Sequence, residues 1–298
     1  SIYSDLTFPS HNDGWYGVSL PTQIRLYEVA YARYKNPLLL NTLQDCYRLE
    51  DRLSPEALLT NTTIHPDKEL KESESYLFGQ TGYGVLRSGK KSVVLKYGPS
   101  GGGHGHPDKL SISIHNGEKE ILPDLGTCAY GIPDYLNWYK RTLSHNTVTV
   151  DCKDQRPATG QMVYFDDHSI EAFCDKAYPG VEMKRKLLLK GDTLCDEFDC
   201  ISDTIHQYDY VLLLTEQPQI EGEFTGAKLD EAVAYKQIRN VKRSVMNHPF
   251  TVSMPTGKIT FRVDGVPSFE LFVGEASGIP PTNPDIVTKT GKIGRAHV

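Results

Sequence analysis

The chain has 298 residues, and its 38 acidic against 32 basic side chains give a net charge of −6 and a pI near 5.9. This length allows one large or two small domains, and the acidic balance excludes a broadly basic polyanion binder while leaving room for a local positive patch. No apolar run reaches the ~18 residues that predict a membrane-spanning helix, and residues 1–5 lack the features of a signal peptide.

Residues 1–53 have the apolar spacing of two helices. Thr22 is placed to cap the first helix, and Asn36-Pro37 ends it. The second helix begins at Pro37, where proline is tolerated because its missing N–H would have no partner. We expect the two helices to form an antiparallel pair. Their apolar residues are Ile24, Leu26, Val29 and Ala30 in the first and Leu39, Leu40, Leu43 and Tyr47 in the second.

Two segments of irregular composition flank these helices. Residues 8–17 are rich in His, Asn, Asp, Gly, Trp and Tyr and read as a loop. Its polar and aromatic side chains are candidates for ligand contacts, and an ordinary polar loop with packed aromatic rings is an equally good interpretation. Residues 54–80 carry Pro55, Pro66 and several charges, which favours a linker between domains.

From Tyr83 onward the pattern changes to strands. Two hairpin turns are predicted at Asn116-Gly117 and at Gly191-Asp192. Regularly spaced strands with turns between them favour an antiparallel β-sandwich. The expected strands are 91–97, 110–115, 119–122, 184–189, 193–201, 208–215, 258–263 and 269–273.

A group of chemically active side chains begins at His104-Gly105-His106, which closes a glycine-rich run. If this segment is extended, both histidines face the same side. Asp124, at a predicted strand end, and His145, just before a strand, add a carboxylate and a third imidazole. Two histidines and one aspartate can close around a tetrahedral zinc ion, which leaves the other histidine free to meet a substrate. Because an HxH pair alone is a weak signal, two histidines that form hydrogen bonds in a sheet are the alternative.

The same residues resemble the heparinase II/III superfamily of polysaccharide lyases, and most closely polysaccharide lyase family 15, the alginate and heparin exolyases. The resemblance is dense from about Tyr83 to Gln155 and looser to about Glu275. It is specific because several separated motifs occur in the same order. These are Lys96 to Pro99, Gly103 to Leu110, Pro123 to Thr127, Tyr130-Gly131, Trp138-Tyr139, Leu143 to Val148 and Asp151.

This resemblance implies an α+β protein in which an α/α toroid precedes a C-terminal antiparallel β-sandwich, with the active site in the cleft between them. Residues 1–53 would then be the last helices of a truncated toroid, 54–80 the linker, and 81–292 a C-terminally truncated sandwich. Residues 293–298 match what one frame of a common sequencing adapter encodes, so we expect them to be a foreign tail. Both ends of the natural protein are expected to lie outside this chain.

The resemblance also implies roles for the histidine group. His104 matches the sandwich histidine that acts at the uronate carboxylate, so we predict that it is catalytic. His106, Asp124 and His145 match a structural zinc site, with a metal-free hydrogen-bonded cluster as the alternative. The toroid tyrosine and histidine that carry much of the family's proton transfer have no counterpart here.

Further residues have side chains that could stack on sugar rings or bind acidic groups. Core packing or ordinary surface exposure is the alternative for each of them. The candidate substrate contacts are Asn12, Asp13, Lys109, Tyr130, Tyr139 and Arg141.

The implied function is the C-terminal part of a lyase that cleaves uronic-acid glycans, such as alginate or heparin-like and heparan-like chains, by β-elimination. We expect the fragment to be inactive alone. The alternative is a non-catalytic sandwich that binds acidic glycans; a zinc hydrolase would need Asp108 as its base, and the resemblance argues against it. The expected partner is an acidic polysaccharide or oligosaccharide and not a nucleic acid, and the expected location is periplasmic or secreted.

Overall fold

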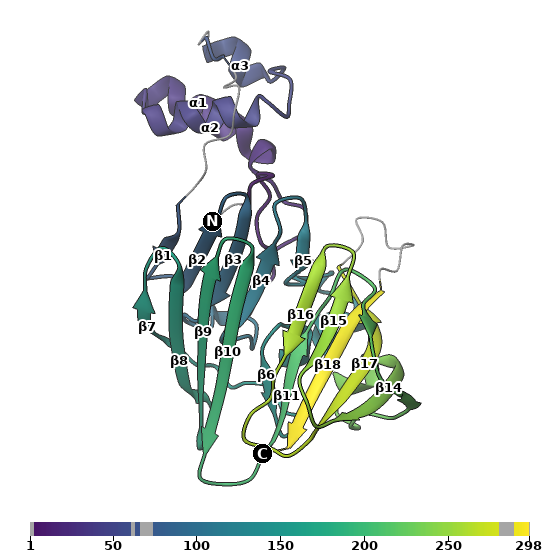
Figure 1. The fold of residues 1–298 in the computed structure, drawn as a ribbon. Helices are drawn as coiled ribbons and strands as arrows, with labels where there is room; N and C mark the ends of the chain where they lie inside the picture. The colour runs from purple at the N-terminus through teal and green to yellow at the C-terminus, as the bar shows by residue number, and fades with distance from the viewer. Residues whose placement is uncertain (1–2, 61–62, 66–73, 280–288, 298) are drawn as a thin grey trace.

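Beyond residue 75, alternating apolar and polar residues form antiparallel strands through most of the chain (Figure 1). The structure is a computed structural model that describes residues 3–60, 63–65, 74–279 and 289–297. Every strand pair in this described part is antiparallel. The eight strands predicted from the sequence are all present, with ends shifted by a few residues. Antiparallel β-structure is therefore confirmed.

The strands form four sheets (Figure 1). In spatial order, the five-stranded sheet is β1 (Tyr76–Phe78), β2 (Tyr83–Ser88), β3 (Lys91–Lys96), β4 (Ser111–His115) and β5 (Glu120–Leu122). The four-stranded sheet is β10 (Thr193–Ser202), β9 (Val181–Lys190), β8 (Ser169–Tyr178) and β7 (Gln161–Phe165). The six-stranded sheet is β13 (Thr225–Gly226), β14 (Arg239–Met246), β17 (Phe269–Ser277), β18 (Lys289–His297), β11 (Gln207–Leu212) and β6 (Val148–Val150). The three-stranded sheet is β12 (Gln219–Ile220), β15 (Phe250–Met254) and β16 (Gly257–Phe261).

The largest apolar cluster among the described residues is formed mainly by strands of the sheets. It includes Leu95 of β3, Ile170 of β8 and Leu187 of β9, all fully buried. The five-stranded and four-stranded sheets approach so closely that a Cβ on Gly84 would lie 1.9 Å from Cδ1 of Ile170. Burying one such side chain contributes about 1.5–3 kcal/mol, so this core dominates the favourable side of folding.

The two predicted hairpins form as the turn residues indicate. Asn116-Gly117 joins β4 to β5, and Gly117 takes a positive φ of 105°. Gly191-Asp192 joins β9 to β10, and Gly191 has a φ of 54°. Glycine suits both turns because it has no Cβ to clash at positive φ.

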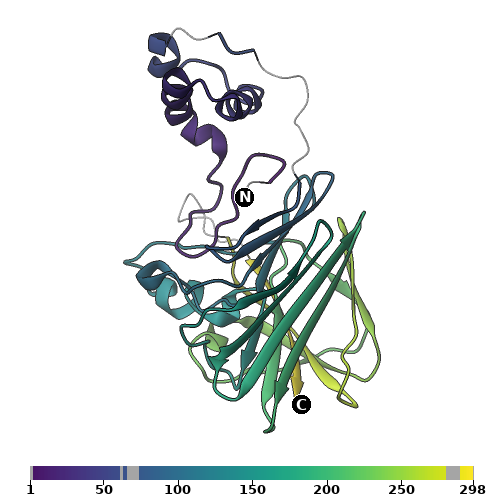
Figure 2. The same ribbon diagram turned by 90° about the vertical axis from the view of Figure 1, so that its left-hand side faces the viewer.

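The three α-helices gather at one end of the molecule, away from the sheets (Figures 1 and 2). They are α1 (Ile24–Tyr34), α2 (Pro37–Cys46) and α3 (Pro55–Thr60), and the 3-10 turn η1 (Leu20–Gln23) precedes them. The short helical turns η3 (Tyr135–Tyr139), η4 (Thr142–Ser144) and η5 (Tyr235–Gln237) occur within the strand-rich part of the chain. α1 packs against both α2 and α3. The buried carboxylate of Glu28 ties them together, accepting hydrogen bonds from the Tyr47 hydroxyl (2.5 Å) and from Nε of Arg52 (2.6 Å).

Several details of this region differ from the sequence prediction. Thr22 lies within η1 and donates to the Ser19 carbonyl, so it does not cap α1. Leu26 and Val29 are exposed, because the packed face of α1 is the one that carries Glu28. The segment expected as a linker, 54–80, contains α3 and β1. That these helices are the last of a toroid, and that the domains divide as expected, stay predictions.

The C-terminal strand β18 pairs with β11 and β17. Its backbone includes residues 293–297 of the expected foreign tail, and Val298 lies outside the described residues. The origin of this tail stays a prediction. Among the helices described, none is long and apolar enough to cross a membrane.

Candidate functional site

Four segments that are distant in sequence meet at one end of the five-stranded sheet. The antiparallel register brings the end of β3, the residues before β4 and the residues after β5 to the same level. The loop 8–17 then lies against them: Ser10 Oγ donates to the Asp124 carbonyl (2.8 Å), and the Thr127 amide donates to the Gly14 carbonyl (3.1 Å). Strand ends and a docked loop together hold the candidate site.

Glycines make this close approach possible. A Cβ on Gly105 would lie 1.3 Å from the Ser100 carbonyl oxygen. Gly126, at a φ of 60°, has the Gly14 carbonyl oxygen 2.2 Å from the place where its Cβ would stand. A side chain at either position would push apart the segments that carry the histidines and Asp124.

The carboxylate of Asp13 is the centre of the solvent-facing half of the site. Its Oδ2 lies 2.8 Å from His104 Nδ1, and its Oδ1 lies 3.1 Å from His106 Nε2. The hydroxyls of Tyr130 and Tyr135 donate to Oδ2 over 3.3 Å and 3.2 Å. Burial raises the pKa of Asp13, but the hydrogen bonds from His104, His106 and Tyr135 outweigh it and leave the pKa below its usual range.

The two histidines of the HxH motif both reach Asp13 but differ sharply in exposure. His104 closes the 3-10 turn η2 (Gly102–His104), and its side chain is 78% exposed. The His106 side chain is 0% exposed. The condition under which the two would share one side, an extended segment, is therefore not met: the chain is a 3-10 turn up to His104 and becomes extended only at Gly105.

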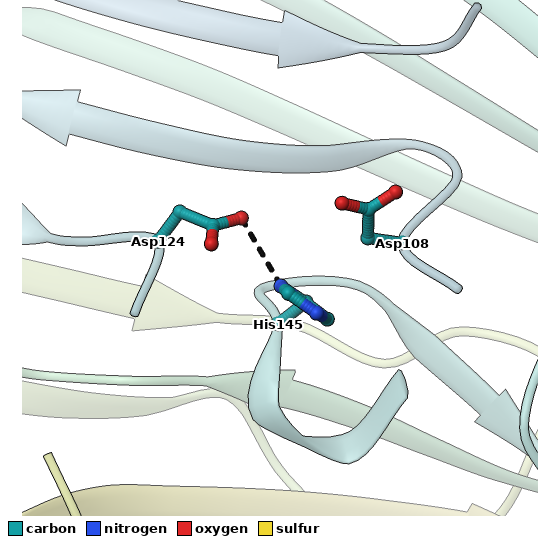
Figure 3. Close-up of side chains that lie close together, drawn as sticks. All are labelled: Asp108, Asp124 and His145. Atoms are coloured by element: carbon teal, nitrogen blue, oxygen red, sulfur yellow. Dashed lines mark hydrogen bonds and ion pairs between the residues drawn. The ribbon is translucent and has the colours of Figure 1, made fainter. Parts of the chain in front are cut away.

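The buried half of the site consists of two carboxylates, each with its own hydrogen-bond donors. Asp124 Oδ2 accepts from His145 Nδ1 (3.1 Å), and its Oδ1 accepts from the Gly126 amide (3.0 Å), as Figure 3 shows for the histidine. Lys96 Nζ donates to Asp108 Oδ2, and Lys109 Nζ lies 3.5 Å from Asp108 Oδ1. All of these side chains are almost fully enclosed, so charge compensation is obligatory.

Burial and neighbouring charges set the protonation of these groups. Burial would raise the pKa of Asp108, but Lys96 holds it below its usual range. Burial would also raise the pKa of Asp124, and His145 holds it well below its usual range. Burial lowers the pKa of His106 to about 4. At neutral pH both carboxylates are therefore ionised, and His106 is neutral.

Three of the buried residues could hold a metal ion. The ligand atoms of Asp108, Asp124 and His145 lie within 4.8 Å of one another (Figure 3). His145 Nε2 is buried and has no hydrogen-bond partner in the described part of the chain, so it is available as a ligand. Asp108 Oδ1 also accepts no hydrogen bond there, but the Lys109 ammonium lies 3.5 Å from it. His106 is not in this group, which differs from the predicted ligand set. Its Nε2 is bonded to Asp13, but its Nδ1 is buried without a hydrogen-bond partner among the described residues, so the ligand set His106, Asp124 and His145 stays a prediction.

Three predicted substrate contacts instead serve the protein interior. Asn12 Oδ1 accepts from Lys96 Nζ and from the His106 amide (3.3 Å). Lys109 is 1% exposed beside Asp108. Tyr139 is 4% exposed, and its hydroxyl donates to the Gly278 carbonyl (2.8 Å).

The remaining candidates reach the surface. Tyr130 is 62% exposed, and its hydroxyl lies 3.3 Å from Nδ1 of His104. Arg141 is partly exposed and pairs with Asp154 (2.8 Å). Nearby, Lys140 Nζ donates to the Tyr135 hydroxyl (3.1 Å) and to the Gly103 carbonyl (2.5 Å). Positive charge thus lies near His104 although the whole chain is acidic.

Sequence reasoning missed several residues that hold the site together. Asn146 donates to the carbonyls of Ile112 (2.9 Å) and Pro123 (2.8 Å), which joins β4 to the Asp124 segment. Nη1 of the buried Arg185 in β9 donates to the backbone carbonyls of Leu110 and Asn146, both at 2.7 Å. Alternation along β9 was a usable signal for Arg185, which shares the inward face with the buried apolar residues Val181, Met183, Leu187 and Leu189.

Comparison with known proteins identifies the family. The family model described as heparinase II/III-like, C-terminal, matches residues 71–266, more than half of the chain. The protein therefore belongs to the heparinase II/III-like family. This confirms the resemblance inferred from the motifs.

Individual relatives match only part of their own length. An exo-oligoalginate lyase of Saccharophagus degradans is 29% identical over 122 residues, which is 33% of this chain and 16% of that protein. A heparin-sulfate lyase of Bacteroides stercoris is 30% identical over 118 residues, 36% of this chain and 18% of that protein. The chain therefore spans less than a fifth of either relative within the matched region.

A solved structure of a heparinase III gene product superposes on the whole chain. The TM-score is 0.67 at 15% sequence identity, and the match covers 100% of this chain and 41% of that one. At this identity the likeness establishes the fold, which is mostly antiparallel sheet with few helices.

Proposed function

We propose that this chain is the sandwich part of a polysaccharide lyase that cleaves uronic-acid glycans by β-elimination. The observation that carries the proposal is the exposed His104, whose Nδ1 lies 2.8 Å from Asp13 Oδ2. The Tyr130 hydroxyl donates to the same oxygen over 3.3 Å, and the buried carboxylates Asp108 and Asp124 belong to the same site. The lyases among its relatives support this class of reaction.

The reaction makes three demands. The uronate carboxylate must be neutralised so that the C5 proton becomes acidic, a base must remove that proton, and an acid must protonate the oxygen that leaves C4. The imidazolium form of His104 meets the first demand, because its outward Nε2–H can donate to the carboxylate oxygens while its Nδ1–H stays on Asp13. Lys140 adds positive charge on the same side.

The substrate class is an acidic glycan such as alginate or heparin-like and heparan-like chains, and the location is periplasmic or secreted. The relatives named as alginate and heparin-sulfate lyases support the substrate class. A sandwich that only binds acidic glycans would not need an exposed histidine that is hydrogen-bonded to a carboxylate, as His104 is to Asp13. Catalysis is therefore the better interpretation.

The buried group Asp108, Asp124 and His145 would hold a structural zinc ion. Such an ion would cross-link the segments before β4, after β5 and before β6. Elemental analysis of the purified protein against His145→Ala tests this assignment. Equal zinc content in both proteins would remove the metal from the proposal, and a His106→Ala sample tests the ligand set that the sequence predicted.

The lyase assay follows the absorbance of the unsaturated uronate product, with alginate and with heparin as substrates. We expect turnover by the complete gene product and none by residues 1–298 alone, because the proton-transfer residues expected in the toroid are not in this chain. Release of product by residues 1–298 would show that the roles assigned here are wrong. Binding without turnover by the complete product would favour the binding module.

A further inference from the structure

Asp13 lies in the loop 8–17, far in sequence from every histidine it touches. Its side chain is 6% exposed, whereas the His104 side chain bonded to it is 78% exposed. Hydrogen bonds reach it from His104, His106, Tyr130 and Tyr135. In this arrangement a sugar could contact His104 and Tyr130, which are exposed. It could not readily bond to the Asp13 carboxylate, whose oxygens already accept hydrogen bonds from protein side chains.

We propose that Asp13 is a positioning residue that fixes the tautomer and orientation of His104, and not a substrate contact as the sequence suggested. The inference rests on the proposed function for its catalytic meaning. Its structural content, a carboxylate that selects one imidazole tautomer, stands on the hydrogen bonds alone.

The tautomer follows from hydrogen-bond chemistry. An ionised carboxylate accepts and cannot donate, so the proton between Asp13 Oδ2 and His104 Nδ1 belongs to the imidazole. In neutral His104 the lone pair is then on Nε2, the outward ring nitrogen. Without Asp13, this exposed ring would take the Nε2–H form that free imidazole prefers. Asp13 therefore determines which atom His104 presents to a ligand.

The loop that carries Asp13 is built to hold it still. Asn12 has a φ of 59°, and its Oδ1 accepts from the buried Lys96 and from the His106 amide. Ser10 and Gly14 are hydrogen-bonded to the Asp124–Thr127 segment on the other side. With contacts on both flanks, the carboxylate has a fixed place, which is what orienting an exposed side chain requires.

Asp13 also joins the two halves of the site. Its Oδ1 accepts from His106 Nε2, so a neutral His106 ring keeps its lone pair on Nδ1. The His106 and His145 ring centroids are 5.2 Å apart. One carboxylate thus selects the tautomers of an exposed and a buried histidine, and couples the position of His104 to the packed interior.

The test is an NMR measurement on 15N-labelled residues 1–298 at a pH where free imidazole is neutral. Long-range proton–nitrogen correlations show which ring nitrogen of His104 carries hydrogen. We expect the Nδ1–H form in the wild type. In Asp13→Ala, His104 should lose this form and take the Nε2–H form that free imidazole prefers. The same tautomer in both proteins would overturn the proposal.

Asp166→Ala is the matched control, because Asp166 also accepts a tyrosine hydroxyl, from Tyr164 (2.7 Å), but on a distant surface turn. If Asp13→Ala does not fold, Asp13→Asn replaces it. Its amide keeps the volume but has one accepting oxygen, so one of the two histidines must change tautomer or lose its bond. Two unchanged rings would again contradict the proposal.

Kinetics of the complete gene product supply the catalytic arm. Asp13→Asn should lower kcat at least about 10-fold while KM changes less, as for other groups that orient a reacting side chain.

In a His104→Ala background, Asp13→Asn should lower kcat little further, because both substitutions remove the same function of His104. If the two effects on kcat are fully additive, Asp13 does not act through His104. Absence of lyase activity in the wild type would overturn the proposed function alone, and the tautomer measurement would still decide the role of Asp13.

Discussion

His104 and His106 are two residues apart and of the same type, yet they belong to opposite halves of the site. The His104 side chain is 78% exposed and that of His106 0% exposed, although both are hydrogen-bonded to Asp13. The outer half, with Tyr130, offers groups to a ligand. The inner half, where Lys96 and Asp108 are ion-paired, offers compensated charge that solvent does not reach.

The difference shows that burial decides the part each residue of the motif plays: exposed His104 can meet a ligand, and buried His106 supports the structure around it. A charge in the inner half must keep its partner, because an uncompensated buried charge destabilises the fold. A group in the outer half can change its charge or partner at small structural cost. The two halves should therefore respond to mutation in opposite ways.

The largest expected effect is on activity in the outer half. In the complete gene product, His104→Ala should lower kcat by about 10²–10⁴-fold, the usual contribution of a proton-transfer or charge-stabilising group. The melting temperature should stay close to that of the wild type because the side chain is exposed. His168→Ala, at an exposed histidine in a surface turn, is the control. Near-normal kcat with a lowered melting temperature would place His104 in the scaffold.

The inner half should show the opposite result. Asp108→Asn leaves two enclosed ammonium groups, Lys96 and Lys109, without their carboxylate, and should lower the free energy of unfolding by about 3–5 kcal/mol. Urea unfolding measures it. Asp192→Asn removes a carboxylate from a surface pair with Lys91 and should have little effect. If the two variants are equally stable, the buried pair is not needed for the fold.

A third buried group predicts a pH dependence. Burial raises the pKa of Glu120 to about 8, against the hydrogen bond from Tyr3, which lowers it. Between about pH 4.5 and pH 8 the folded chain therefore keeps a proton on Glu120 that the unfolded chain releases. This group favours folding at low pH, and its contribution is lost as pH rises to about 8.

Glu120→Gln removes that titration while keeping an acceptor for Tyr3. Its stability relative to the wild type should increase from pH 5 to pH 8, by about 1.4 kcal/mol for each pKa unit of the shift and by a few kcal/mol in all. Urea unfolding at several pH values tests it, with Glu118→Gln in the same hairpin as the exposed control. A constant difference across this range would show that Glu120 is ionised in the folded protein.

The smallest effect concerns Tyr139, which the sequence named as a candidate substrate contact. Tyr139 is buried, and its hydroxyl donates to the Gly278 carbonyl. Tyr139→Phe should lower stability by about 0.5–1.5 kcal/mol, the net value of one hydrogen bond, and leave KM unchanged. Tyr76→Phe, at an exposed tyrosine, controls for the substitution itself. A raised KM with unchanged stability in Tyr139→Phe would instead show that the Tyr139 hydroxyl contacts the substrate.

The sequence by itself determined the strand positions, both hairpins and the family, because alternation, turn chemistry and ordered motifs are local properties of the chain. It also named Asp13, His104, Asp124 and His145 as members of the site. The roles that it assigned, catalysis for His104, substrate contact for Asp13 and metal binding for Asp124 and His145, stay predictions. The alternation argument failed at His104 because the 3-10 turn η2 interrupts the strand period.

Only the tertiary structure decided which groups face a ligand and which support them. Asp13 meets His104 across 91 positions of sequence, and Asn146 meets Leu213 across 67. The placement of Lys96 on Asp108, and of Asp108 rather than His106 in the possible metal group, depends on the same packing. Exposure, hydrogen-bond partners and pKa are set by the atoms around a side chain, and most of those atoms come from distant segments of the chain.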